Sequence, residues 1–126
     1  MAAVRSKGNK TTEMRLVRIF RKHGINGWRR HSPLLGKPDF VFRKNRVAVF
    51  VDGCFWHGCP KHWRTPKENR RYWRQKIERN KERDGLVTGR LRYSGWLVLR
   101  IWEHELKNEA RLMARMVRFW PLHPRR

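Results

Sequence analysis

The run Trp96-Leu-Val-Leu-Arg-Ile-Trp102 constrains the fold of this chain more than any other segment. Six of its seven residues are apolar, and the apolar positions do not alternate with polar ones. A strand with one solvated face alternates, so this pattern predicts a β-strand that is buried on both faces. The chain must therefore build a sheet that other elements cover.

Two more strands and three helices are predicted around this run from apolar periodicity and from helix start and stop signals. The expected helices cover residues 11–23, 68–92 and 105–119, and the expected strands cover 39–42 and 47–51. Residues 43–46 are expected to join the two strands as a hairpin, and residues 53–66 to form an irregular insert. The order αββ, insert, αβα predicts an α/β fold with a small mixed sheet in one domain, residues 1–126, with a short basic arm, residues 1–10.

The charge of the chain is strongly one-sided, because 32 Lys and Arg stand against 10 Asp and Glu, a net charge of +22. Residues 64–83 hold nine basic residues interleaved with Tyr72, Trp73 and Ile77, which predicts a folded basic surface. A solvated helix face with ion pairs is the alternative, but this segment offers only three acids as partners. Contacts to the phosphates of a nucleic acid account better for the excess and predict a steep salt dependence of binding.

Several classes of protein are excluded by composition. The longest uninterrupted apolar run, residues 47–51, is far shorter than the roughly 20 residues that cross a membrane. The first seven residues lack the apolar core of a signal peptide. A disordered polycation would not carry 12% aromatic residues. We therefore expect a folded cytoplasmic protein, associated with the nucleoid when it is bound to DNA, with no membrane partner.

A group of soft ligands lies in the insert, where Cys54, Cys59 and His62 occupy the pattern Cys-x4-Cys-x2-His. Structural zinc sites take four such ligands in a tetrahedron. His104, just after the buried strand, is the leading candidate for the fourth, and His57 is the competitor. Two buried thiols, or a disulfide in an exported chain, are the alternatives. Without an export signal, zinc is the favoured interpretation, and it would hold together a loop with little apolar content.

Two carboxylates stand at the ends of the hydrophobic hairpin strands. Asp39 opens the first strand after Pro38, and Asp52 closes the second. Acids at such positions contribute little to a sheet and are well placed to bind a divalent cation. Each could instead be a turn former or an ion-pair partner, and for Asp52, which precedes Gly53, that alternative is serious.

Asp84 continues the apolar stripe that Trp73 and Ile77 begin, so a helix would carry this acid toward the interior. Glu13 starts a helix in the basic N-terminal third of the chain. A positive protein that keeps such acids beside apolar segments could use them to recruit Mg²⁺ against DNA phosphates. His57 would then be suited to proton transfer near neutral pH.

Four ordered blocks resemble the very short patch repair (Vsr) endonucleases. The blocks are Gly36-Lys-Pro-Asp-Phe-Val-Phe42, Val49-Phe-Val-Asp-Gly-Cys-Phe-Trp-His-Gly-Cys-Pro-Lys-His62, Trp73-Arg-Gln-Lys-Ile-Glu-Arg-Asn-Lys-Glu-Arg-Asp84 and Gly95-Trp-Leu-Val-Leu-Arg-Ile-Trp-Glu-His104. The resemblance covers residues 11–119. It implies a restriction-endonuclease-like αββαβα core with structural zinc, which nicks DNA 5′ to the thymine of a T:G mismatch in DNA repair, using Mg²⁺. The EDxHD homing endonucleases are similar in the same core.

The resemblance also implies roles for individual residues. Asp39 corresponds to the metal-binding aspartate, and the main-chain carbonyl of Val51 to its second inner ligand. His57 corresponds to the histidine that acts on the attacking water, and Glu13 and Asp84 to supporting acids. The zinc positions correspond to Cys54, Cys59, His62 and His104.

The aromatic residues Phe55, Trp56 and Trp73 correspond to family residues that intercalate beside the mismatched pair. Wedging rings into a stack is easiest where a mismatch has already weakened it. Trp96 and Trp102 are expected in the core instead, and Trp73 could be a core residue too. The basic residues expected to hold flanking phosphates are Lys37, Arg70, Arg74 and Lys76.

The chain departs from the family pattern in two places. Asp52 stands where some relatives have a catalytic histidine, which favours metal support over proton transfer. Relatives usually carry a longer N-terminal arm with an Arg-Ser-x-Asn-Met motif, whereas Arg5-Ser-Lys7 is followed here by Gly8-Asn-Lys10. Three functions therefore stay open: a mismatch nickase acting as a monomer, a site-specific endonuclease without a mismatch requirement, and a zinc-stabilised DNA-binding module without catalysis.

Overall fold

The computed structural model of this chain describes residues 10–61 and 63–119. Its elements in chain order are α1 (Lys10–Lys22), β1 (Trp28–Arg30), β2 (Phe40–Phe42), β3 (Val47–Asp52), α2 (Arg70–Tyr93), β4 (Leu97–Trp102), the 3₁₀ helix η1 (Glu103–Lys107) and α3 (Glu109–Phe119). The strands form one mixed sheet in the order β1-β2-β3-β4. The predicted α/β class with a small mixed sheet is confirmed, as are the hairpin and the three predicted helical regions.

The central strand β3 joins the antiparallel and parallel parts of the sheet. It pairs antiparallel with β2, with Phe40 opposite Val49, and parallel with β4, with Asp52 opposite Trp102. A parallel pair needs a crossover connection, and the insert and α2 supply it. Because β3 and β4 run in the same direction, their carboxyl ends lie at the same edge of the sheet.

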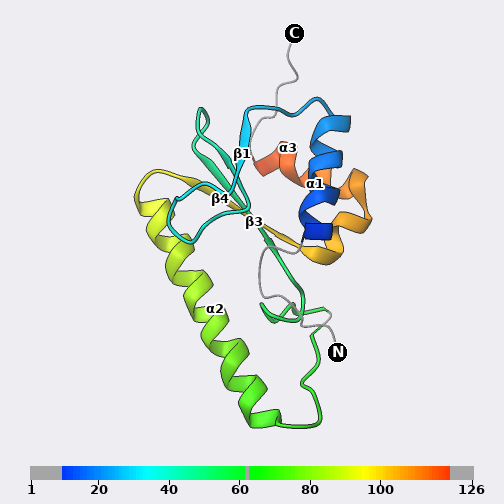
Figure 1. Ribbon diagram of the computed structural model, residues 1–126, viewed down its shortest axis with the longest axis vertical. Coiled ribbons are helices and arrows are strands. Elements are labelled where there is room, and N and C mark those ends of the chain that lie inside the picture. Colours follow the sequence, from blue (N-terminus) through cyan, green and yellow to red (C-terminus); the bar gives the residue numbers. More distant parts are fainter. Residues whose placement is uncertain (1–9, 62, 120–126) are drawn as a thin grey trace.

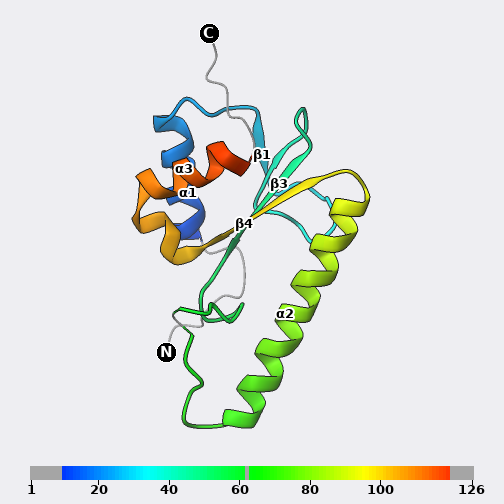
Figure 2. The same cartoon turned by 180° about the vertical axis from the view of Figure 1, so that it is seen from behind.

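Helices cover the sheet on both faces (Figures 1 and 2). On one face α1 and α3 enclose the larger apolar core, in which Leu16, Phe20, Phe40, Ile101 and Met116 are fully buried. On the other face α2 packs against a smaller cluster of Ala48, Phe50, Leu91 and Val98. This two-sided cover explains why β3 is buried at all six positions and why β4 is nearly continuously apolar.

Strand β1 was not predicted, because its three residues, Trp28-Arg-Arg30, lack an apolar pattern. It forms by pairing antiparallel with β2. The Trp28 ring also packs edge-on against Phe40 at 5.5 Å and lies 5.9 Å from Phe20. Tertiary contacts therefore create this strand where local propensity does not.

The last helical segment differs from the continuous helix predicted over 105–119. Residues Glu103–Lys107 form a 3₁₀ helix, and α3 begins only at Glu109. Asn108 separates the two, and its Oδ1 accepts a hydrogen bond from the Arg111 N–H at 3.1 Å. A side-chain oxygen that caps a free helix N–H favours a new helix start at this point.

Helix α2 is long and only partly attached to the sheet. It has 24 residues, of which Ile77, Asn80 and Leu91 are buried, and its first half extends past the strands (Figure 1).

Among the described residues, no helix combines the length and the hydrophobicity that a membrane span requires.

Candidate active site and metal centre

A cavity of about 130 Å³ lies between the carboxyl end of β3 and the face of α2. Four of the five predicted catalytic residues line it, each from a different segment. Asp39 precedes β2, Asp52 ends β3, His57 lies in the insert, and Asp84 lies on α2. The folded chain therefore brings together side chains that are up to 45 positions apart in the sequence.

Asp39 is buried and accepts a hydrogen bond from the Val51 N–H at 2.7 Å. The β2–β3 pairing ends with Phe40 opposite Val49, and the chain bends at Asp39. The Val51 N–H therefore bonds to the Asp39 side chain and not to the main chain of the neighbouring strand. The N–H and C=O of one strand residue point to the same side of the strand, so the Val51 carbonyl lies on the side of β3 that faces Asp39. Both residues line the cavity, and their oxygens are of the kind that suits a hard cation.

His57 lies between two carboxylates. Its Nδ1 is 2.5 Å from Asp84 Oδ2 and 3.9 Å from Asp52 Oδ1. A contact as short as the one to Asp84 marks a charge-assisted hydrogen bond. In the tautomer in which Nδ1 donates to Asp84, Nε2 is the ring nitrogen that acts as the acceptor.

Asp52 is also paired with Arg100, whose Nη1 lies 3.0 and 3.1 Å from the two carboxylate oxygens. Burial raises the pKa of Asp52 above its ordinary value, and the positive charge of Arg100 acts in the opposite direction. Arg100 therefore offsets part of the cost of a carboxylate buried at the end of a strand.

Arg100 is a site residue that was not predicted from the sequence. It lines the cavity from β4, and its Nη2 donates to the main-chain carbonyl of Asp84 at 3.3 Å. The signal that could have found it is visible in the sequence, because Arg100 is the single charge in an otherwise apolar buried run. A charge in such a strand needs a partner.

Glu13 lies away from this cavity. Its carboxylate is buried, with 3% of the residue exposed, and Oε1 accepts a hydrogen bond from Arg30 Nη2 at 2.7 Å. Glu13 therefore links α1 to β1, and it is not among the residues that line the cavity.

Two contacts fix the insert against α2. Buried Asn80 donates from Nδ2 to the main-chain carbonyl of Trp56 at 2.8 Å. Gly58 has φ +66°, and a Cβ there would lie 2.8 Å from Cγ2 of Ile77. The close approach and the positive φ both require glycine at this position. These contacts place His57, which lies between Trp56 and Gly58, beside Asp84.

Three of the four predicted zinc ligands form a cluster. The Nδ1 atom of His104 lies 3.4 Å from Sγ of Cys54 and 3.6 Å from Sγ of Cys59, and all three ligand atoms lie within 4.8 Å of one another. Bond lengths of about 2.3 Å to sulfur and 2.0 Å to nitrogen in a tetrahedron place S and N about 3.6 Å apart. The arrangement therefore fits one tetrahedral ion. The fourth predicted ligand, His62, lies outside the described residues.

Burial of the Cys54 side chain favours its neutral thiol form. Burial raises its pKa to about 11, while its hydrogen bond with His104 acts in the opposite direction. A thiolate at neutral pH would therefore need a bound cation to stabilise it.

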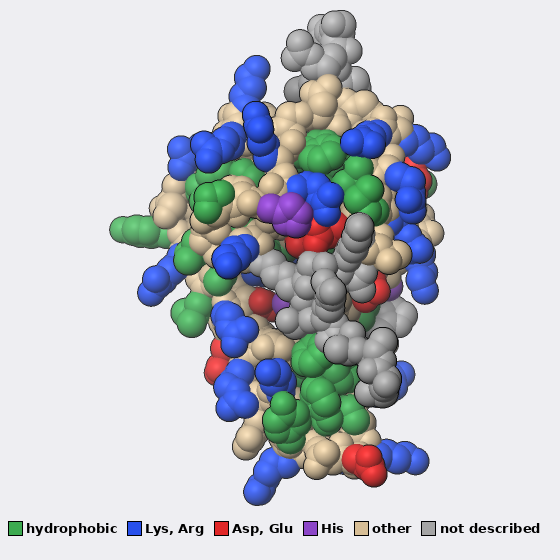
Figure 3. Space-filling view, in the orientation of Figure 1, with side chains coloured by type: hydrophobic (Ala, Val, Ile, Leu, Met, Phe, Trp, Pro, Cys, Tyr) green, Lys and Arg blue, Asp and Glu red, His purple; other side chains and the backbone are tan. Residues whose placement is uncertain are grey.

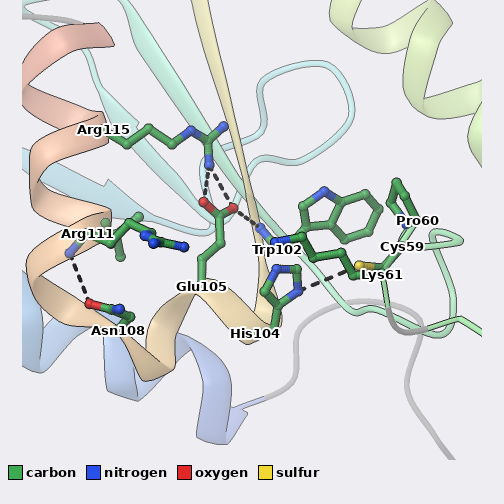
Figure 4. Close-up of a pocket in the computed structure, with 10 residues that line it drawn as sticks. Cys59, Pro60, Lys61, Trp102, His104, Glu105, Asn108, Arg111 and Arg115 are labelled. Atoms are coloured by element: carbon green, nitrogen blue, oxygen red, sulfur yellow. Dashed lines mark hydrogen bonds and ion pairs between the residues drawn. The ribbon is translucent and has the colours of Figure 1, made fainter.

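Behind the cluster, Cys59, His104 and α3 line a second cavity of about 380 Å³, in which Arg115 binds Glu105 at 2.7 Å (Figure 4).

The predicted DNA-contacting aromatics form a cluster between the insert and the start of α2. Trp73 lies 5.2 Å from Phe55, 5.7 Å from Trp56 and 5.1 Å from Tyr72, measured between ring centroids. Tyr72 was not predicted to take part, and it is 52% exposed. Hydrophobic side chains gather at this end of the molecule, among the many basic side chains that surround them (Figure 3).

The predicted phosphate-binding residues lie beside the cavity and the aromatic cluster. Arg70, Arg74 and Lys76 lie on the first two turns of α2, and both arginines are exposed. Lys37 is exposed in the loop before Asp39 and has a positive φ of 51°. Gly36 beside it has φ +77°, and a Cβ there would come within 2.4 Å of Val87 Cγ1, so this loop packs closely against α2.

Comparison with known proteins gives one consistent family. The family described as DNA mismatch endonuclease Vsr matches residues 1–65 of this chain. The type II nicking enzyme V.NmeDIP of Neisseria meningitidis serogroup C is 43% identical over 122 residues, which cover 94% of this chain and 80% of that protein. The type II nicking enzyme V.NaeI of Lentzea aerocolonigenes is 55% identical over 74 residues, 59% of this chain but only 45% of that enzyme.

A third relative carries the name of the family itself. The DNA mismatch endonuclease Vsr of Escherichia coli (strain K12) is 35% identical over 101 residues, which cover 79% of this chain and 65% of that protein. The chain therefore belongs to the Vsr family of DNA endonucleases.

Proposed function

We propose that this chain is an Mg²⁺-dependent nickase that hydrolyses one strand of duplex DNA 5′ to the thymine of a T:G mismatch. The observation that carries the proposal is the 2.5 Å contact between His57 Nδ1 and Asp84 Oδ2. It lies in the cavity that Asp39 and Val51 also line. Hydrolysis of a phosphodiester needs a histidine that a carboxylate orients and, beside it, oxygen groups that suit a divalent cation.

The cation would be held by the Asp39 carboxylate and the Val51 carbonyl, with Asp52 in support. Bound there, Mg²⁺ would stabilise the charge that builds on the scissile phosphate. The Asp39 carboxylate is already oriented, because its Oδ2 accepts a hydrogen bond from the Val51 N–H at 2.7 Å. The fit rests on the oxygen donor set and on the position of Asp39, Val51 and Asp52 in one cavity.

His57 would act on the attacking water. Asp84 accepts a hydrogen bond from Nδ1, so Nε2 would be the nitrogen that takes a proton from the water as its oxygen attacks phosphorus. The P–O3′ bond would break as the new P–O bond forms, and the released 3′ oxygen would take a proton from solvent water. Asp84 then stabilises the imidazolium that forms without taking the proton itself, as an orienting carboxylate does. Glu13 would support the site indirectly, because its hydrogen bond with Arg30 holds α1 against β1.

Zinc is the proposed ion of the Cys54, Cys59 and His104 cluster, with His62 as the fourth ligand. Two sulfurs and a histidine nitrogen at tetrahedral spacing support zinc over the hard cations, which prefer oxygen. The ion would anchor the insert to the start of η1, and so hold His57 at the cavity.

The aromatic cluster would supply mismatch recognition. Phe55, Trp56 and Trp73 lie next to one another beside the catalytic cavity, with basic side chains around them. Rings placed in this way can enter a base stack and kink the duplex where pairing is weak. One catalytic cavity cuts one strand at a time, which supports a nickase that acts as a monomer. The proposed fold of this monomer is a single restriction-endonuclease-like domain.

A second candidate is a site-specific nicking enzyme that does not need a mismatch. Its support is that two of the similar proteins, V.NmeDIP and V.NaeI, are type II nicking enzymes by name. The two candidates share the cavity and the chemistry, and they differ only in what the aromatic cluster recognises.

One assay separates the candidates. Duplexes that differ only in T:G against T:A at one pair are incubated with the protein in Mg²⁺ or in EDTA, and nicks are mapped on a denaturing gel. We expect an Mg²⁺-dependent nick 5′ to the mismatched thymine. Equal nicking of both duplexes would support the second candidate. Binding without any Mg²⁺-dependent nick would contradict both and leave a DNA-binding module.

A further inference from the structure

The Arg100 side chain makes several polar contacts within the protein. It lies in the middle of β4, and its side chain is only 22% exposed. Its Cζ lies 4.1 Å from the centroid of the Phe50 ring. This guanidinium lines the catalytic cavity and is also held by several contacts within the protein.

The guanidinium of Arg100 joins three elements. Nη1 binds Asp52 on β3 at 3.0 Å, and Nε and Nη2 donate to α2, to Thr88 Oγ1 at 2.8 Å and to the Asp84 carbonyl at 3.3 Å. The main chain of Arg100 is fixed from behind, because Arg115 Nη2 donates to its carbonyl at 2.8 Å. The planar fork of arginine can make all these bonds in one orientation, whereas a lysine cannot.

Helix α2 depends on this tie at Asp84. Its apolar attachment to the sheet runs through Leu91 and Val87, which lie toward its C-terminal end. Asp84 lies N-terminal to both of these residues, near the middle of the helix. The bonds from Arg100 to Thr88 and to the Asp84 carbonyl therefore set how close this turn comes to His57.

Arg100 Nη1 lies between the two carboxylates that flank His57, 3.0 Å from Asp52 Oδ1 and 3.8 Å from Asp84 Oδ1. Asp52 gives both oxygens to Arg100 Nη1 and stays 3.9 Å from His57 Nδ1, while Asp84 reaches Nδ1 at 2.5 Å. Without the guanidinium, Asp52 would be free to turn toward the ring and compete with Asp84. The ring would then lose its single orientation.

We propose that Arg100 is a positioning residue, which assigns Asp84 to His57 by holding Asp52 away and by fixing the Asp84 turn of α2. The proposal rests on the function proposed above for His57. It differs from the simpler possibility that Arg100 only neutralises a buried Asp52.

The two possibilities separate in an Asp52→Asn background. There no buried negative charge at position 52 needs a partner, so Arg100→Met can be added without leaving one. Single-turnover nicking is measured for Asp52→Asn and for Asp52→Asn/Arg100→Met at saturating protein. We expect the second substitution to lower the rate constant on the order of tenfold to a hundredfold, as misplacement of a catalytic group does. Equal rate constants would overturn the proposal.

Arg46→Met in the same background is the matched control. Arg46 also lies over an aromatic ring, 5.3 Å from the Trp96 centroid, and donates to a main-chain carbonyl, that of Ser94, at 3.0 Å. It lies in the hairpin turn at the opposite end of β3 from Asp52. We expect this control to match Asp52→Asn in rate constant, and a drop equal to that of Arg100→Met would contradict a local role.

A readout without catalysis tests Arg100 even if the chain does not nick. In a protein labelled with ¹⁵N-histidine, the hydrogen-bonded Nδ1 proton of His57 should give a low-field resonance, assigned by its loss in His57→Gln. We expect this resonance in the wild type and in Asp52→Asn, and its loss in Asp52→Asn/Arg100→Met. Its persistence there would overturn the proposal, whereas absence of nicking by the wild type would overturn only the proposed function.

Discussion

Asn80, one turn before Asp84 on α2, donates a hydrogen bond to the main-chain carbonyl of Trp56 at 2.8 Å. This buried amide therefore connects the helix that carries the orienting carboxylate with the loop that carries His57. Asn80→Ala would leave the Trp56 carbonyl unpaired, and we expect a loss of about 1–3 kcal/mol in the free energy of unfolding. Urea unfolding checks this, and the nicking rate should fall as well, because His57 loses its support. The exposed Asn45→Ala should change neither quantity.

The charge of Asp39 can be removed without removing its hydrogen bond. In Asp39→Asn the amide oxygen can still accept from the Val51 N–H, so the melting temperature should stay close to that of the wild type. Nicking should fall on the order of a thousandfold, because a neutral amide binds Mg²⁺ poorly. Gel-based nicking and DNA binding are measured together, with Glu78→Gln on α2 as the control. Activity within a few fold of wild type would refute the metal assignment.

Loss of one cluster ligand should remove the structural ion. We expect His104→Asn and Cys59→Ser to reduce zinc from about one ion per chain toward none, measured by elemental analysis. The free energy of unfolding should fall on the order of several kcal/mol, since the ion holds the insert. His31→Asn is the matched control, because His31 is exposed and its φ of 58° suits asparagine. Undiminished zinc in the cluster variants would exclude those ligands.

Two tyrosines on α2 test where DNA lies. Tyr72 packs on Trp73 in the aromatic cluster, whereas Tyr93 lies at the other end of the helix and is 95% exposed. Tyr72→Ala should weaken binding of mismatched duplex by about 1–2 kcal/mol, as the loss of one base-stacking ring does. Tyr93→Ala should leave the Kd unchanged. Fluorescence anisotropy at fixed salt compares them, and equal effects would place the duplex elsewhere.

Stability should depend on pH through the contact between α1 and α3. Hydrogen bonds from His23 and then Lys22 lower the pKa of Glu109 below its ordinary value of 4.5. A carboxyl group whose pKa is lowered by folding stabilises the fold at pH values above its ordinary pKa. This stabilisation is lost as the pH falls from the ordinary pKa through the lowered pKa of the folded state. The difference in Tm between wild type and Glu109→Gln should therefore be present at neutral pH and vanish in acid. Exposed Glu68→Gln serves as the control, and a difference that is constant with pH would contradict this origin.

The elements that carry a strong apolar pattern could be predicted from the sequence. Strands β3 and β4 and helix α2 follow from runs and stripes that have one physical interpretation. Strand β1 could not be predicted, because pairing with β2 and the packing of Trp28 create it. The break at Asn108 depends on a side-chain cap that competes with a continuous helix.

The candidate site could be predicted in its membership but not in its pairings. Asp39, Asp52, His57 and Asp84 stood out as polar residues at strand ends, in the insert and on an apolar stripe, and they line one cavity. Nothing in the linear pattern assigns His57 to Asp84 or Asp52 to Arg100, because those pairs depend on how α2 crosses the sheet. Glu13 was grouped with the other acids by charge, and its partner is Arg30.

The end of the β2–β3 ladder has a consequence for how this site can vary. The proposed cation ligand at Val51 is its main-chain carbonyl, so this oxygen belongs to the backbone and not to a side chain. Position 51 can then exchange one strand-forming residue for another and keep its ligand, since every residue carries a carbonyl. Position 39 has no such freedom, because its own carboxylate accepts the Val51 N–H and would also bind the proposed cation. Two neighbouring ligands of one proposed ion are therefore open to sequence change to very different degrees.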